Sequence, residues 1–130
     1  MPWVEVFAVL VVSHAVGDFL LQTEWQATHK RAGLGRDAER RRALVSHAAT
    51  YTLAFAPALV WLAGDLGAAG TAALAAGVFL PHLVQDDGRL LGAYVRTVKR
   101  TEPAPGMLML AVDQSFHLLV LFGLAAAAGG

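Results

Sequence analysis

The chain contains no cysteine and comparatively few charged residues. Without cysteine it has no disulfide framework, no thiolate nucleophile and no Cys-ligated zinc site. Metal or acid–base chemistry therefore falls to its five histidines and its carboxylates. Charged residues make up 15% of the chain, against roughly 25% in an average soluble domain, which excludes a disordered tail, a coiled coil and a nucleic-acid-binding arm. Ten basic residues balance ten acidic ones, so the net charge identifies no partner.

Long apolar runs occupy most of the 130 residues, of which 56% are hydrophobic. About 20 apolar residues cross a bilayer as a helix, and four such windows are present, at about 3–22, 43–63, 68–94 and 107–128. They are separated by a charged loop, a polar turn at 64–67 and a segment that contains two prolines. The sequence therefore predicts an all-α fold, with one integral membrane domain over 1–130 built as a four-transmembrane-helix bundle. A soluble bundle is disfavoured because stretches within the first and last windows have no polar face.

The basic residues indicate how this bundle is oriented. All ten lie in or beside two loops, the first and the third: Lys30, Arg31, Arg36, Arg40, Arg41, Arg42, Arg89, Arg96, Lys99 and Arg100. Loops rich in Lys and Arg stay on the cytoplasmic side of a membrane. We therefore expect both loops to be cytoplasmic and both termini to be outside.

Seven ionisable side chains interrupt the apolar windows, although each costs roughly 2.5–3.5 kcal/mol to insert. Six of them form three His/Asp pairs at spacing i, i+4, which places both members on one helix face. At about 1.5 Å per residue, all seven reach one layer in the cytoplasmic half of the bundle. They are His14, Asp18, His47, His82, Asp86, Asp113 and His117.

Imidazole nitrogens and carboxylate oxygens together are the ligands of zinc, manganese and non-haem iron. Seven ligands are too many for one tetrahedral ion, and two divalent ions with a bridging hydroxide would balance three carboxylates. We therefore expect a dinuclear site with all seven residues as ligands, in which one aspartate is alternatively a general base. Plain ion pairs, a bis-histidine haem and a proton or ion path remain alternatives.

The order and spacing of these residues resemble a known family. The similarity lies in His14-x-x-x-Asp18-Phe-x-x-Gln-Thr, His47-x-x-x-Tyr51, His82-x-x-x-Asp86 and Asp113-Gln-x-x-His117, over nearly the whole chain. The family comprises small bacterial membrane proteins catalogued as domain of unknown function 3307. It is itself similar to predicted membrane-bound metal-dependent hydrolases. The resemblance implies a multi-pass protein of the bacterial cytoplasmic (inner) membrane and a hydrolase activity.

The family often has Lys three residues after the third-motif aspartate, where this chain has Arg89. If that Lys binds a substrate phosphate, Arg89 does so here with different geometry. We expect a hydrolase that attacks a lipid-like phosphoester or ester with a metal-activated water, with Asp18, Asp86, Asp113 and Arg89 as catalytic residues.

Two other functions remain open, and each differs from hydrolysis in what the site must do. A metal-ion or proton transporter, or a subunit of one, needs polar groups on both sides of the site, and the outer half of the windows has few. A structural membrane subunit clamped by metal needs only saturated coordination. Membrane lipids are the expected partners, nucleic acid is not, and a homo-oligomer or a larger complex remains open.

Overall fold

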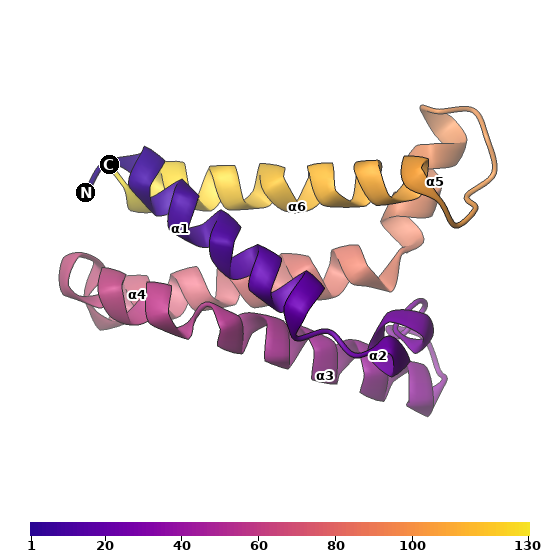
Figure 1. Ribbon diagram of the computed structural model, residues 1–130, viewed down its shortest axis with the longest axis horizontal. Coiled ribbons are helices and arrows are strands. Elements are labelled where there is room, and N and C mark those ends of the chain that lie inside the picture. Colours follow the sequence, from indigo (N-terminus) through magenta and orange to yellow (C-terminus); the bar gives the residue numbers. More distant parts are fainter.

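The computed structural model describes residues 1–130 and is all-helical (Figure 1). The elements in chain order are α1 (Trp3–Ala15), the π-helical turn η1 (Val16–Leu20), α2 (Glu24–His29), α3 (Ala38–Ala54), α4 (Ala56–Asp87), α5 (Arg89–Thr97) and α6 (Met107–Ala128).

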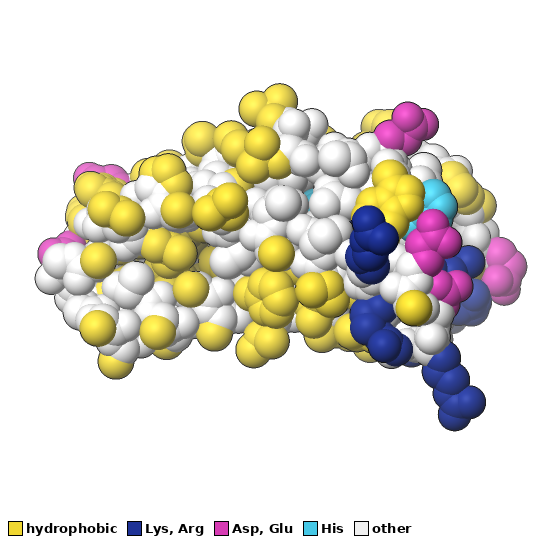
Figure 2. Space-filling model, turned by 90° about the horizontal axis from the view of Figure 1, so that it is seen from below, with side chains coloured by type: hydrophobic (Ala, Val, Ile, Leu, Met, Phe, Trp, Pro, Cys, Tyr) yellow, Lys and Arg dark blue, Asp and Glu magenta, His cyan; other side chains and the backbone are white.

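Three helices are long and apolar enough to cross a membrane: Trp3–Leu20, Ala56–Asp87 and Met107–Ala128. Most residues along them face outward, and many large apolar side chains are exposed on the surface (Figure 2). An apolar outer surface of this extent suits lipid rather than water as the surrounding solvent. The protein is therefore a helical membrane protein by length, composition and surface.

The helix boundaries differ from the expected windows in the middle of the chain. The expected window 43–63 is divided, because α3 ends at Ala54, Phe55 forms a turn and α4 begins at Ala56. Within α4, Gly67 has φ 67° and ψ 176°, so two helical rods meet there, and the ribbon turns back on itself at that end of the molecule (Figure 1). Glycine adopts this positive φ without steric cost.

The expected window 68–94 is also shorter than predicted. Its helix ends at Asp87, where Gly88 has φ 81°, and α5 then runs as a separate helix. A left-handed glycine is a common helix terminator. The last helix, Met107–Ala128, coincides with the last expected window.

The helices enclose an apolar core. In α1, α3, α4 and α6, a buried histidine lies one helical turn from a core residue, and these histidines form a polar layer next to the core. Core residues include Phe55, Ala58 and Leu62, all buried. Residues four apart lie on the same helix face. The core therefore continues into buried histidines: Leu10 to His14, Tyr51 to His47, Val78 to His82, and Leu121 to His117. This shared register places the histidines at one level of the bundle.

The Lys and Arg side chains gather at one end of the molecule (Figure 2), and the polar layer adjoins this end, because Lys30 of the first basic loop reaches Asp86. There the chain forms the short helix α2, which a capping box begins: the Thr23 hydroxyl accepts from the Gln26 N–H, and the Gln26 side chain accepts from the Thr23 N–H. Asp37 caps α3 in a similar way. The N–H groups of Arg40 and Glu39 donate to its carboxylate and lower the pKa of Asp37.

Candidate metal centre

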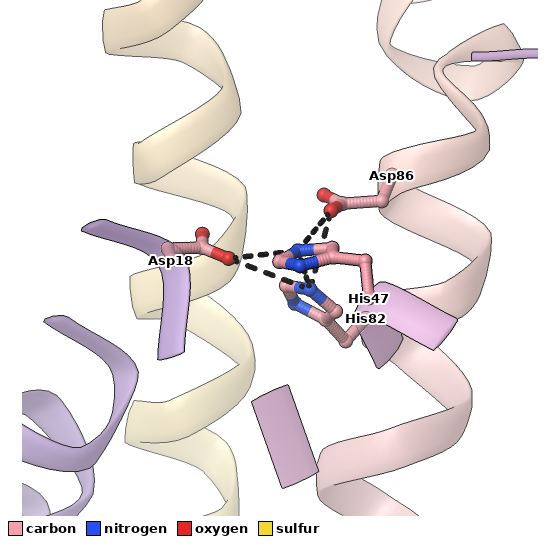
Figure 3. A group of neighbouring side chains, drawn as sticks. All are labelled: Asp18, His47, His82 and Asp86. Atoms are coloured by element: carbon pink, nitrogen blue, oxygen red, sulfur yellow. Dashed lines mark hydrogen bonds and ion pairs between the residues drawn. The ribbon is translucent and has the colours of Figure 1, made fainter. Parts of the chain in front are cut away.

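Four buried side chains from three segments face one another at the centre of the polar layer (Figure 3). Asp18 comes from η1, His47 from α3, and His82 and Asp86 from α4. Nε2 of His47 lies 3.2 Å from Oδ1 of Asp18 and 2.9 Å from Oδ2 of Asp86. Nε2 of His82 lies 3.5 and 3.2 Å from the same two oxygens. The two Nε2 atoms are 3.0 Å apart.

These distances are close to the edges of a small coordination polyhedron. Zinc binds His nitrogen and carboxylate oxygen at about 2.0–2.2 Å, so the ligand atoms of a tetrahedral site lie about 3.3–3.6 Å apart. The five distances between donor atoms here span 2.9–3.5 Å, so most are shorter than these edges and the donors would move slightly apart around an ion. Two histidines and two aspartates are also a donor set that zinc accepts. The four residues, called the four-donor group below, could therefore hold a divalent ion.

A second group shares Asp86 and adds Asp113 and His117 from α6. Nδ1–H of His117 donates to the backbone carbonyl of Asp113 at 2.7 Å, so Nε2 carries the lone pair of the neutral ring. That Nε2 lies 3.2 Å from Oδ1 of Asp86 but makes no hydrogen bond. A lone pair facing a buried carboxylate is repulsive unless a cation or a proton lies between them. The three residues, called the three-donor group, thus also fit a metal.

In His47 and His82, the ring nitrogen that faces away from the other donors lacks a hydrogen-bond partner. Nδ1 of His47 and Nδ1 of His82 have no hydrogen-bond partner, whereas metal-bound histidines usually donate their other N–H. The ring of His82 instead stacks on Tyr51, with ring centres 3.4 Å apart and an angle of 7° between the planes. Stacking fixes the orientation of this imidazole in place of the missing hydrogen bond.

The backbone of the first segment is adapted to bring Asp18 into the cluster. The π-helical turn Val16–Leu20 contains both Gly17 and Asp18, and such turns are frequent at functional sites. A Cβ atom on Gly17 would lie 2.7 Å from Cδ2 of Tyr51. Glycine therefore lets this segment approach α3 closely enough for Asp18 to reach His47.

His14 lies beside the cluster but in neither donor group. Its Nε2–H donates to Oε1 of Gln114 at 2.8 Å, and its Nδ1 accepts from the Tyr51 hydroxyl at 2.9 Å. Both ring nitrogens of His14 are thus hydrogen-bonded to residues outside the expected ligand set. His14 therefore lies next to the donor groups and is not one of the ligands that they bring together. Gln114 also donates to Oδ2 of Asp18 at 3.4 Å and to Oδ2 of Asp113 at 3.3 Å, which connects the two donor groups.

Arg89, the expected phosphate-binding residue, lies outside the cluster. Its side chain is 58% exposed, and its Nε is 3.5 Å from Oδ2 of Asp87. Asp87 is buried and accepts the N–H of Leu34 through Oδ1, while its backbone carbonyl accepts the N–H of Ala32. The two adjacent aspartates thus make different contacts. Asp86 belongs to both donor groups, whereas Asp87 connects the first basic loop to the end of α4.

Comparison with family models assigns the chain over residues 6–128. The matching family is described as "Protein of unknown function (DUF3307)". The chain belongs to this family. No similar protein was found among the curated proteins or among the solved structures.

One residue of this DUF3307 domain enters the cluster although the sequence pattern assigned it only to a basic loop. Lys30 follows α2, and its Nζ donates to Oδ2 of Asp86 and to Oε1 of Gln22, both at 2.6 Å. Its side chain is largely buried. The Thr23-x-x-Gln26 capping pattern was the available signal, because it marks a helix that turns the loop back toward the bundle.

Proposed function

We propose that this protein is a membrane-embedded metal-dependent hydrolase that acts on a lipid-like phosphoester at the cytoplasmic leaflet through a two-ion His/Asp centre. One observation carries the proposal: two buried donor groups share Asp86, whose two oxygens face opposite groups. Carboxylates that serve two groups of ligands are typical of dinuclear centres in helix bundles. Zinc, manganese and iron all suit these donors.

The two groups differ in how many coordination positions they fill. The four-donor group would supply all four ligands of an ion, as closed structural sites do, whereas the three-donor group would leave a position for water or substrate. We therefore assign the reaction to Asp86, Asp113 and His117. Asp113 has the most exposed side chain of the three, at 22%, so substrate approaches from its side. A divalent ion held there supplies Lewis-acid activation of water and of the scissile bond.

Lys30 changes the charge balance of the centre and favours an anionic substrate. Three aspartates carry −3, and the ammonium group 2.6 Å from Asp86 reduces this to −2. One divalent ion then neutralises the cluster, and a second leaves an excess of +2 in a low-dielectric site. Such an excess stabilises a phosphoester and the charge that develops on it more than it stabilises a neutral ester.

The proposed topology has four membrane passes with both termini outside, in the cytoplasmic membrane of a bacterium. It is supported by the reversal of α4 at Gly67 and by the basic residues at one end of the bundle (Figure 2). The chain has no cysteine, so single cysteines report position without background. The cysteine of Asp65→Cys should react with an impermeant maleimide in intact spheroplasts, and that of Ala104→Cys only after lysis. The reverse pattern would overturn this topology.

Hydrolysis is tested with the purified protein loaded with zinc or manganese in mixed micelles. A lipid phosphate monoester is the substrate, and released phosphate is measured. Asp113→Asn should abolish turnover and lower the metal content from two ions to one, while His29→Gln, outside the cluster, should change neither. Absence of turnover in protein that holds two ions would refute the hydrolase.

A structural metal clamp is the second candidate, favoured by the complete four-donor group. That group joins η1, α3 and α4, and helix association in lipid is weak without polar contacts. A clamp predicts one ion per chain and loss of the folded bundle on chelation, without turnover. A transporter is less well supported, because the outer half of the interior consists of apolar residues such as Val6, Leu62 and Leu74.

A further inference from the structure

A second polar site lies at the basic end of the bundle, on the other side of the Asp86–Asp87 pair. It is a cavity of about 290 Å³ lined by Arg31, Arg89 and Arg96, with Asp87, Gly88 and Met109 among its other walls. Arg31 comes from the loop after α2, and the other two arginines lie seven residues apart on α5. That spacing is two helical turns, so Arg89 and Arg96 project from one face of α5.

The cavity carries excess positive charge. Of its lining residues, Asp87 is the acidic one, and this carboxylate already accepts the Leu34 N–H and pairs with Arg89. Arg96 pairs with Glu102 at 3.2 Å, but both side chains are exposed, and exposed ion pairs contribute little. Arg31 forms no ion pair, and the pairs of Arg89 and Arg96 leave exposed guanidinium groups that an anion can also contact.

The backbone at the start of α5 adds to this potential. Gly88 precedes the helix without a side-chain cap, so the first N–H groups of α5 keep the partial positive charge of a helix N-terminus. A Cβ atom on Gly88 would lie 3.0 Å from Nη1 of Arg31. Glycine thus lets a guanidinium group approach the helix start, where both can face one ligand. Three arginines and the N-terminus of α5 thus line one cavity, which distinguishes it from a surface with dispersed basic residues.

We propose that this cavity binds the phosphate of an anionic phospholipid headgroup. Arginine binds phosphate through two parallel hydrogen bonds. Leu90 follows the cavity residue Arg89 on α5, and Met107 precedes the cavity residue Met109 by two positions on α6; both are exposed and offer apolar contact for the adjoining lipid chain. A free phosphate would use the guanidinium groups but not these apolar neighbours. The site is separate from the donor groups, so it does not depend on the hydrolase proposal.

The test compares two double variants of equal charge in metal-free protein. Arg31→Gln with Arg96→Gln removes two cavity arginines, and Arg36→Gln with Arg100→Gln removes two basic residues that do not line the cavity. Arg89 is retained because it neutralises Asp87. Binding of fluorescent short-chain phosphatidate is measured in phosphatidylcholine-containing micelles, and thermal unfolding confirms that each variant is folded.

We expect the cavity variant to bind phosphatidate about ten- to hundredfold more weakly than the wild type, and the control variant to bind within about twofold of it. Equal weakening of both variants would show that overall charge alone attracts the lipid and would overturn the site. Inorganic phosphate is the second arm. If it displaces phosphatidate at comparable concentrations, the cavity is a soluble-phosphate site and the lipid assignment is wrong.

Discussion

Replacing His82 by glutamine tests the four-donor group most directly. The substitution keeps a polar side chain of similar size but removes Nε2, which lies 3.0 Å from Nε2 of His47 and 3.2 Å from Oδ2 of Asp86. The binding free energy of a structural zinc ion is about 10–16 kcal/mol. Shared among four donors, the loss of one is about 2.5–4 kcal/mol, or about 10²–10³-fold in the zinc dissociation constant.

The dissociation constant is measured by competition with a chromophoric chelator, and metal content by elemental analysis of detergent-purified protein. His29→Gln is the matched control, because His29 is the one histidine outside the layer and its side chain is 42% exposed. The substitution also removes the stacking of His82 on Tyr51. A variant that unfolds for this reason would lose metal as well. His47→Gln, measured alongside, should weaken binding to the same extent while thermal unfolding verifies the fold.

The reasoning fails if folded His82→Gln protein binds zinc as tightly as the wild type, because the Nε2 atom would then have no place in the coordination shell. It also fails if His29→Gln loses as much affinity, which would mean that binding follows histidine content and not the geometry of the cluster.

Three further substitutions test the surroundings of the centre. Lys30→Met removes the ammonium partner of a buried carboxylate and should destabilise metal-free protein by about 3–5 kcal/mol. Added zinc should restore the melting temperature, and a variant that zinc does not rescue would contradict the shared role of that carboxylate. Gly17→Ala places a Cβ atom 2.7 Å from Tyr51 and should cost about 1–3 kcal/mol in unfolding experiments, whereas Gly64→Ala, with open space around it, should be nearly neutral. Gln114→Leu removes hydrogen bonds to the donor residues and should weaken zinc binding about 10- to 100-fold; unchanged affinity would show that these bonds do not orient the ligands.

The pairing of His and Asp at i, i+4 could be predicted because it depends only on helical periodicity. His82 with Asp86 and Asp113 with His117 do share a face in this way. The role of His14 could not be predicted by the same rule. Its nitrogens are taken by Gln114 and Tyr51, which reach it from other helices.

The helix boundaries show the same division between local and tertiary causes. Met107–Ala128 could be located because it is a continuous apolar run with prolines before it. The π-helical turn Val16–Leu20 could not, because it lies where Gly17 passes close to Tyr51, 34 residues away in the chain, and no local periodicity marks that approach.

Composition and periodicity by themselves determined that this protein is an all-helical chain for a lipid environment, with its basic loops together and with four of its five histidines and three aspartates at one depth. These properties follow from rise per residue and from the cost of placing charge in hydrocarbon. Which donors meet was decided only by tertiary structure. Lys30, and not Arg89, is the cation that pairs with Asp86, while Asp87 accepts from the first basic loop. Both contacts depend on how the loops fold back on the helices. Contacts between distant segments depend on side-chain packing in three dimensions, which no local repeat in the chain encodes.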